Sequence, residues 1–526
     1  MGSGLILFAL AGLCVGVVAE DAKDPANMVW PRPSNVSFGN GVVCLDSEHW
    51  FMEPAEFNLA ERSLGSSSDR DDIREALARF RESTFIHRAK KDSKCVKEYK
   101  LTVKRQGVAL QFGVDESYKL HVNQDSIEIE SNTIYGAYHG LESLRQLVHF
   151  DFDEKAFVIR NSPWVIDDVP RFSHREVLID TARHYEPVKV IRNVIDSITM
   201  SKINTIHWHI EDQHTFAWCS EKYPSMCKAT AWSIEERYTK EDLQDIVEYA
   251  RKRGVRIYVE IDIPGHTGAF CTGLRAANID ICCENHDMIA PREKTLEVLH
   301  NLIDEAKEIF PDSFIHLGGD EVNTAAWKED KKTQEWMKAQ NMSDPKDVYK
   351  YFVDSVHNHA IEIGLRPAGW SEIWQTFTTR LNKKTIVQQW LDQDNMTEIT
   401  MNGYNVLFSD QNYWYLDHLN QRWDLMYKIE PCASLTDTQC SLILGGGGCM
   451  WGETVDPSDI MSTIWPRLGA IGERLWSPRA VNNVDTALPR IINFRCYLNR
   501  QGVGAAHVGT DGRVPPKGPG GCYEAT

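Results

Sequence analysis

The segment His316-Leu317-Gly318-Gly319-Asp320-Glu321-Val322 places two adjacent carboxylates directly after a short apolar stretch, with a pair of glycines between them. The apolar residues at 314–317 predict a β-strand. Neighbouring side chains of a regular strand face opposite ways, but glycines permit unusual dihedral angles that would let both acids reach one cleft. Two close acids shift each other's pKa, which suits a proton donor. A solvated acidic loop is the alternative interpretation.

This strand is the fourth of eight candidate strands that follow Arg171, with amphipathic helical segments such as 188–201 and 240–253 between most of them. Eight strand–helix units over this length predict an α/β fold, a (β/α)₈ TIM barrel. A doubly wound open sheet is the alternative, but neither a Gly-x-Gly-x-x-Gly fingerprint nor a P-loop supports it. The candidate strands are 177–180, 205–210, 256–262, 314–317, 366–370, 385–390, 405–409 and 442–444.

The barrel prediction has a functional consequence, because chemistry in barrels lies at the carboxyl ends of the strands. The acidic, basic and aromatic residues of this sequence gather at those predicted ends. They are Arg183, Asp212, Asp262, His266, Asp320, Glu321, Trp370, Glu372, Trp390, Asp392, the segment 410–417, Trp451 and Glu453.

A smaller α/β domain is predicted to precede the barrel. It has candidate strands at 99–103, 111–114 and 126–130 and candidate helices at 71–87 and 133–148. The segment 164–170, with two acids and a proline at its end, is predicted as a linker. We therefore expect residues 20–170 to form the N-terminal domain with its linker, and residues 171–526 to form the barrel with a C-terminal tail.

Composition and the first residues predict a protein of the secretory pathway. Of 526 residues, 42% are hydrophobic and 25% charged, as in ordinary globular proteins, and the net charge of −18 argues against nucleic-acid partners. The apolar run 5–18 followed by Ala19 predicts a signal peptide over residues 1–19, since it is short for the alternative, a membrane anchor. Glycosylation sequons begin at Asn35, Asn341 and Asn395.

Thirteen cysteines, one of them inside the predicted signal peptide, indicate disulfides in an oxidising compartment. Candidate pairs are Cys44–Cys95, Cys219–Cys227, Cys432–Cys440 and Cys496–Cys522. The sequence does not assign partners to Cys271, Cys282, Cys283 and Cys449. No Cys-x-x-Cys pattern suggests zinc or redox chemistry.

Several motifs in order carry a resemblance to a known family. They are His207-Trp208-His209, Asp262-Ile263-Pro264-Gly265-His266, the segment 316–322, Trp451-Gly452-Glu453, and flanking motifs at 115–118, 136–142 and 472–476. The chain resembles family 20 glycoside hydrolases, the β-N-acetylhexosaminidases, and looks most like their eukaryotic lysosomal or secreted branch.

The resemblance implies an exo-acting, retaining hydrolase of terminal β-linked N-acetylglucosamine (GlcNAc) or N-acetylgalactosamine (GalNAc). In that family the 2-acetamido oxygen of the substrate attacks the anomeric carbon, and an oxazolinium intermediate forms without a protein nucleophile. It further implies a glycan partner, no cofactor and no metal, a homodimer, and lysosomal or extracellular residence.

The resemblance also implies roles for individual residues. Glu321 would be the general acid and then the base, positioned by Asp212 and His266. Asp320 would orient the acetamido N–H, and Tyr415 would donate to its oxygen. The remaining predicted residues would bind the sugar: Trp370, Trp390 and Trp451 around the acetyl group, and Arg183, Asp417 and Glu453 at the hydroxyls. Alternatives are barrel-mouth packing for the tryptophans, an Arg183–Asp180 ion pair, and a structural role for His266.

Two features bear on specificity and on the loops. An acid at Asp417, beside His418, predicts a preference for neutral over sulfated sugars. Relatives usually carry a cysteine just after the acid pair, where this chain has Ala325-Ala326-Trp327, so the loop disulfide near Cys282 and Cys283 must differ or be absent.

Three rival functions are weighed against this resemblance. His207 and His209 share one strand face and, with Asp262, His266 and Asp320, could form a metallohydrolase site. A lectin built on the same pocket would have no need of a proton donor such as Glu321. A conventional double-displacement glycosidase would use a carboxylate nucleophile.

Overall fold

The computed structural model describes residues 29–47, 58–59, 68–90, 95–96, 98–391 and 395–509. The predicted signal peptide 1–19, Asp392 and Cys522 lie outside these residues. Within the described part of the chain, no helix is both long and apolar enough to cross a membrane.

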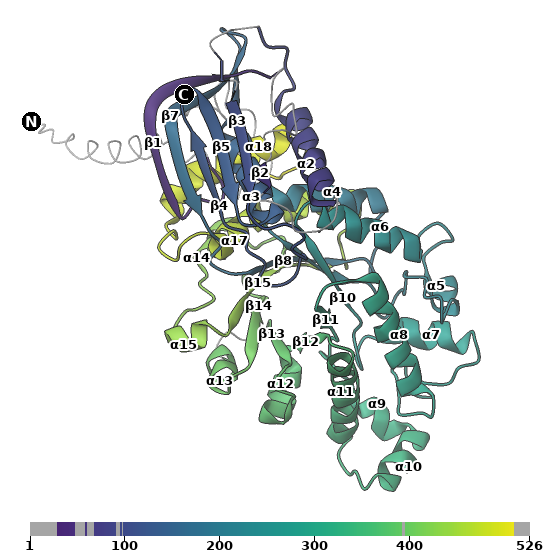
Figure 1. The fold of residues 1–526 in the computed structure, drawn as a ribbon. Helices are drawn as coiled ribbons and strands as arrows, with labels where there is room; N and C mark the ends of the chain where they lie inside the picture. Colours follow the sequence, from purple (N-terminus) through teal and green to yellow (C-terminus); the bar gives the residue numbers. More distant parts are fainter. Residues whose placement is uncertain are drawn as a thin grey trace, which may run out of the picture.

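Eight parallel strands close into a barrel, with β8 lying between β9 and β15, as predicted (Figure 1). Their residues are almost all buried, because the barrel interior covers one face and helices cover the other, and polar side chains such as Glu176, His207 and Gln388 are among them. The strands are β8 (His174–Asp180), β9 (Thr205–His209), β10 (Arg256–Glu260), β11 (Phe314–His316), β12 (Arg366–Trp370), β13 (Ile386–Gln389), β14 (Asn405–Phe408) and β15 (Ile443–Met450).

Helices follow each barrel strand, and the two helices predicted at 188–201 and 240–253 are present. A capping box, in which Thr239 and Asp242 exchange hydrogen bonds, begins the second of them. The helices are α4 (Val188–Thr199), α5 (Ser225–Thr230), α6 (Lys240–Arg251), α7 (Gly268–Arg275), α8 (Thr295–Ile309), α9 (Thr324–Glu329), α10 (Lys331–Ala339), α11 (Pro345–Glu362), α12 (Ser371–Phe377), the 3₁₀-helix η3 (Thr378–Arg380), α13 (Asn395–Met401), α14 (Trp423–Lys428), α15 (Asp437–Cys440), α16 (Ile460–Ile464), α17 (Arg467–Trp476) and α18 (Val484–Arg500).

The N-terminal domain is a mixed sheet with the strand order β1-β7-β4-β5-β3-β2, and β6 pairs with β7. Helices α2 (Ser68–Thr84) and α3 (Ile134–Leu147) pack together, and α18 from the far end of the chain lies beside them, where Tyr497 Oη donates to Glu142 at 2.8 Å (Figure 1). The strands are β1 (Asn35–Leu45), β2 (Asn58–Leu59), β3 (Glu98–Val103), β4 (Tyr118–Val122), β5 (Ser126–Ser131), β6 (His149–Asp151) and β7 (Ala156–Asp168).

Two predictions for this domain are wrong. Residues 111–114 form no strand: Gly113 has φ +80°, and Gln111 bonds instead to the barrel, donating to Pro311 O at 2.7 Å and accepting from Ser313 N at 2.9 Å. Most of the predicted linker 164–170 is the end of β7, where alternate side chains are buried.

Buried ion pairs join the two domains. Arg175 of β8 pairs with Glu116 at 2.7 Å, and Lys202 of the barrel pairs with Asp168 of β7 at 2.8 Å. The indole Nε1 of Trp476 also donates to Asp168 at 3.0 Å. All of these side chains are almost completely buried, so each barrel cation is neutralised by an N-terminal acid.

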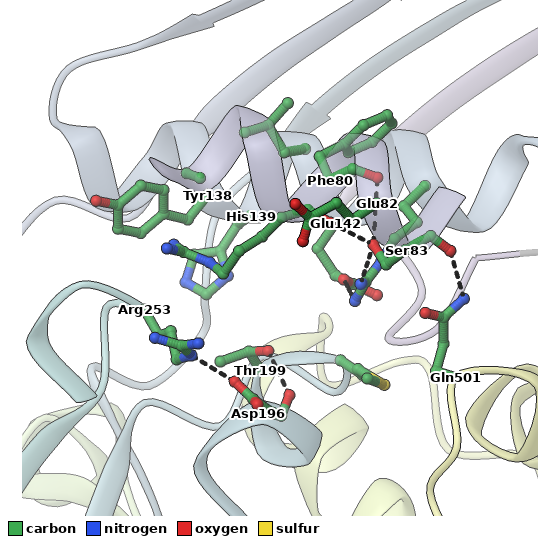
Figure 2. A pocket seen from close by; sticks show the side chains of 15 residues that line it. Phe80, Glu82, Ser83, Tyr138, His139, Glu142, Asp196, Thr199, Arg253 and Gln501 are labelled. Carbon is green, nitrogen blue, oxygen red and sulfur yellow. Dashed lines mark hydrogen bonds and ion pairs between the residues drawn. The ribbon is translucent and has the colours of Figure 1, made fainter. Parts of the chain in front are cut away.

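A cavity of about 450 Å³ lies between the N-terminal helices and the outer helices of the barrel. Figure 2 shows Tyr138 and Glu142 on one side and the Arg253–Asp196 ion pair on the other. Its lining residues come from the domain boundary, so this cavity is separate from the strand ends where the candidate site lies.

Four disulfides have both of their cysteines among the described residues. The predicted pairs Cys44–Cys95, Cys219–Cys227 and Cys432–Cys440 are present, and Cys271 joins Cys282. The loop disulfide is therefore confined to α7 and the loop after it. Cys283 and Cys449 are free and buried. The predicted Cys496–Cys522 pair extends beyond the described residues.

Candidate functional site

A tight turn after β11 directs the two acids into one cleft. The strand ends at His316, and the backbone then takes positive φ at Gly318 (+52°), Gly319 (+92°) and Glu321 (+47°). A Cβ on Gly318 would lie 1.8 Å from Asp262 Oδ1, so only glycine fits. The Gly319 amide donates to that same Asp262 oxygen at 2.9 Å, which fixes the turn against the end of β10.

The His266 imidazole lies between three carboxylates. Its Nδ1 is 3.3 Å from Asp212 Oδ2, and its Nε2 is 3.6 Å from Asp320 Oδ2 and 3.4 Å from Glu321 Oε2. The structure therefore brings together four of the predicted site residues, from the ends of β9, β10 and β11. Asp320 is buried, whereas 62% of the Glu321 side chain is exposed.

The two adjacent acids have opposite pKa shifts. The hydrogen bond to His266 lowers the pKa of Glu321, whereas burial, reinforced by the charge of Asp262, raises the pKa of Asp320 well above its usual value. Burial alone would lower the pKa of His266, but hydrogen bonds to Asp212 and Glu321 raise it. The imidazole is therefore a cation that holds Glu321 ionised in the unliganded protein.

Arg183, after β8, is held by acids from three strand ends. Its guanidinium is 2.7 Å from Asp180, 2.7 Å from Asp212 and 3.5 Å from Glu453. It also lies over the Trp451 ring, 5.2 Å from the centroid. The ion pair with Asp180, which was the structural alternative, exists alongside contacts that direct Arg183 toward the predicted site.

Four aromatic rings form a wall above the barrel interior. Trp390 stacks on Tyr415 with centroids 6.1 Å apart, and Trp370 lies 5.8 Å from Trp451. Two of the indoles are fixed by carboxylates: Trp390 Nε1 donates to Glu372 at 2.8 Å, and Trp370 Nε1 donates to Glu260 at 2.7 Å. The packing gives a rigid apolar surface of the kind that binds a small methyl-bearing group.

Asp417 lies at the end of the β14 loop with one oxygen unused. Its buried Oδ1 has no hydrogen-bond partner among the residues that the structure describes, and His418 Nε2 is 3.8 Å from Oδ2. Burial raises the pKa of Asp417 to about 6. Glu453, which is 55% exposed, lies on the Arg183 side of the site. Both carboxylates can accept hydrogen bonds from hydroxyl groups.

Sequence reasoning missed Glu260, the last residue of β10. Its carboxylate contacts the imidazoles of His207, His209 and His316 at 2.7 to 3.0 Å as well as Trp370. Two histidines on one face of β9, beside an acid on the neighbouring strand, were a usable signal, but Glu260 sits in an otherwise apolar run.

Two groups at the site have a metal-like arrangement: His207 with Glu260 and His316, and Asp262 with His266 and Asp320. In the first group both oxygens of Glu260 already accept hydrogen bonds, from Trp370 and His209. In the second, His266 lies between Asp212, Asp320 and Glu321, and hydrogen bonds to Asp212 and Glu321 raise its pKa. In both groups an imidazole nitrogen lies 3.0 to 3.6 Å from a carboxylate oxygen.

Comparisons with known proteins cover nearly the whole described chain. The family model "Glycosyl hydrolase family 20, catalytic domain" matches residues 172–479, and the model "beta-acetyl hexosaminidase like" matches residues 29–147. The chain is 38% identical to Beta-hexosaminidase 1 of Arabidopsis thaliana, over 99% of this chain and 98% of the relative. It is 36% identical to human Beta-hexosaminidase subunit beta, over 74% of this chain and 72% of the relative. A solved chitobiase of Flavobacterium johnsoniae superposes with a TM-score of 0.76 at 28% identity, covering 90% of this chain and 73% of that one.

Proposed function

The chain belongs to glycosyl hydrolase family 20 and is a glycoside hydrolase of the β-hexosaminidase type, and from the site geometry we propose how it works. It is an exo-acting, retaining β-N-acetylhexosaminidase that removes terminal β-linked GlcNAc or GalNAc. The 2-acetamido oxygen of the substrate attacks the anomeric carbon and gives an oxazolinium intermediate. The observation that carries the proposal is the placement of Asp320 and Glu321 against one imidazole, His266, beside an aromatic wall.

Glu321 is the proton carrier. In the unliganded protein its side chain is largely exposed and His266 keeps it ionised. A bound sugar excludes water from Glu321, and this desolvation raises its pKa so that the carboxylate takes up a proton as the complex forms. Glu321 then protonates the departing glycosidic oxygen and afterwards accepts a proton from the water that opens the oxazolinium ring. The Asp212–His266 pair keeps the carboxyl oriented through both steps.

Asp320 holds the acetamido group. Its buried Oδ1 has no hydrogen-bond partner among the described residues, and an acetamido N–H supplies the missing donor. That hydrogen bond favours the ionised carboxylate, whose negative charge then stabilises the positive charge of the oxazolinium. Tyr415 donates to the acetamido oxygen from the other side, and Trp370, Trp390 and Trp451 enclose the methyl group.

Arg183, Asp417 and Glu453 recognise the hydroxyls of the terminal sugar. Arg183 supplies a planar set of donors already oriented by three acids, and Asp417 Oδ1, which has no hydrogen-bond partner in the described part of the chain, is an acceptor. A sulfate next to the carboxylates of Asp417 and Glu453 would be repelled, so we propose a preference for neutral substrates.

Kinetics on chromogenic β-GlcNAc and β-GalNAc substrates test the proposal. Glu321→Gln is expected to lose both activities while still binding a thiazoline mimic of the intermediate. A substrate without the 2-acetamido group is expected to turn over at close to zero. Rapid turnover of that substrate, or an ester between enzyme and sugar in a trapping experiment, would establish a protein nucleophile instead.

The other rivals have their own tests. Full activity after dialysis against EDTA is expected and would remove the metallohydrolase. A lectin would bind GlcNAc without releasing it from a chromogenic aglycone. Faster turnover of a 6-sulfated chromogenic substrate than of the neutral one would overturn the proposed specificity.

We also propose a setting for the enzyme. Four disulfides and the exposed sequon residues Asn35 and Asn341 support passage through the secretory pathway to the lysosome or the exterior. A homodimer acting on the ends of N-glycans, chitooligosaccharides or glycolipids completes the proposal. Sedimentation of the purified protein tests the dimer, and N-terminal sequencing tests cleavage after Ala19.

A further inference from the structure

We propose that Glu260 is a positioning residue for hydrolysis, one buried carboxylate that fixes both the acetyl pocket and the proton carrier. One oxygen, Oε1, accepts from Trp370 Nε1 at 2.7 Å and lies 3.0 Å from His316 Nδ1. The other, Oε2, is 2.7 Å from His209 Nδ1 and 3.0 Å from His207 Nε2. The inference rests on the proposed function, because it assigns Trp370 to the acetyl pocket and Glu321 to proton transfer.

A chain of side chains with alternating negative and positive charge leads from Glu260 Oε2 to Glu321. His209 Nε2 is 3.1 Å from Asp212 Oδ2, the same oxygen is 3.3 Å from His266 Nδ1, and His266 Nε2 is 3.4 Å from Glu321. An imidazole with a carboxylate at each nitrogen donates at both, so His209 and His266 are both cations between anions. The charge of Glu260 is what keeps His209 protonated in a fully buried position.

The pKa directions agree with this arrangement. Burial alone would raise the pKa of Glu260, but the neighbouring imidazoles of His316, His209 and His207 lower it well below its usual value. Burial alone would likewise lower the pKa of His209, but Glu260 and Asp212 raise it well above the ordinary value. Neutral Glu260 would leave His209 Nδ1 without its anionic partner, and His209 would then become neutral, so that the positive charge beside Asp212 would be lost.

The contacts that Glu260 makes with Trp370 and with His209 affect the kinetics in different ways. Loss of the Trp370 hydrogen bond loosens the acetyl pocket and slows oxazolinium formation equally for every leaving group. Loss of the contact between Glu260 and His209 weakens the interaction that holds Asp212, and through Asp212 the position of His266. Proton donation by Glu321 is then impaired. Impaired proton donation slows substrates with poor leaving groups most, because they depend most on protonation.

Glu260→Gln has a matched control in Glu372→Gln. Glu372 holds Trp390 through the same kind of bond, at 2.8 Å, and no imidazole nitrogen lies within ion-pair distance of it among the described residues. Each variant is assayed on aryl β-GlcNAc substrates whose leaving groups span a range of acidity. Glu260→Gln is expected to lower kcat/KM about 10- to 100-fold for the best leaving group, the loss typical of a displaced catalytic group, and more for poorer ones. Glu372→Gln and Trp370→Phe are expected to lower it by one factor across the series.

A second readout is the pH profile of kcat/KM, which a merely structural role would leave unmoved. Glu260→Gln is expected to shift the limb that reports Glu321, whereas Trp370→Phe, which removes only the indole hydrogen bond to Glu260, leaves that limb in place. Unchanged leaving-group dependence together with an unchanged pH profile in folded Glu260→Gln overturns the proposal.

If Glu260→Gln does not fold, His209→Gln breaks the same chain one step later, and the same two readouts decide. A wild-type-like leaving-group dependence in that variant also overturns the proposal. Failure of the proposed function has a different signature: Glu321→Gln would keep its activity, whatever the Glu260 variant does.

Discussion

Replacing Gly318 by alanine should damage both stability and activity, because two separate strains add at this position. Alanine in the left-handed region costs roughly 1–2 kcal/mol, and Gly318 has φ +52°. Its Cβ would also lie 1.8 Å from Asp262 Oδ1 and 2.7 Å from Asp262 Cα, so rotating the side chain of Asp262 does not relieve the overlap. Overpacking of this kind adds about 1–3 kcal/mol, giving a total of about 2–5 kcal/mol.

Substitution of Gly364 is a control that separates the conformational cost from the steric overlap. It has φ +89°, but nothing lies within 4 Å of a Cβ built there, so Gly364→Ala should lose only the conformational part, about 1–2 kcal/mol. Urea denaturation of both variants measures the difference in unfolding free energy. Kinetics on a chromogenic β-GlcNAc substrate should show about a 100-fold loss for Gly318→Ala, because the turn carrying Asp320 and Glu321 moves by about an ångström. Equal stability and activity of the two variants would refute the steric reasoning.

Three further predictions concern single carboxyl groups. Asp320→Asn should lower kcat by about 10²- to 10³-fold, the loss seen when one group that stabilises developing charge is removed, and a kcat within tenfold of wild type would contradict the role of Asp320. Burial raises the pKa of Asp417 to about 6, and its ionised carboxylate is a stronger hydrogen-bond acceptor than the protonated form. The KM of the wild-type enzyme for a neutral sugar should therefore fall as the pH rises through 6. Asp417→Asn should lack this change, and KM measured from pH 4.5 to 7.5 will detect the difference. Burial, reinforced by the charge of Asp456, raises the pKa of Glu186 to about 8. The folded protein therefore keeps a proton on Glu186 that the unfolded chain releases above about pH 4.3, so the stability of the wild-type protein falls as the pH rises toward 8. Tm measured against pH should show Glu186→Gln gaining on wild type toward alkaline pH, and parallel curves would speak against a protonated Glu186.

The barrel could be predicted because its signal is repetitive. Each apolar strand is followed by an amphipathic helix, and the rule that chemistry lies at strand ends then collects the polar residues into one site. Strand β15 shows the limit of this reasoning: only 442–444 read as a strand, whereas the strand is Ile443–Met450 and includes four consecutive glycines. A Cβ on Gly447 would lie 2.1 Å from Glu176 Cγ, so barrel closure requires glycine where local propensity disfavours a strand.

What the sequence did not predict depends on contacts between distant segments. Glu260 is one acid in an apolar strand, and its importance comes from residues on β9, β11 and β12 that only the closed barrel brings around it. The linker prediction in the N-terminal domain is wrong for a related reason. Acids and prolines near residue 167 resemble a linker in isolation, yet β7 pairs there with both β1 and β4.

The salt bridges across the domain boundary imply that the barrel is not a portable module. A chain starting at residue 171 would carry Arg175 and Lys202 without the acids that pair with them, and it would expose Trp476, which packs into the hydrophobic core of the N-terminal domain. Heating the intact protein should therefore produce one cooperative unfolding transition. Loss of the smaller domain in evolution would require prior substitution of the barrel residues that contact it.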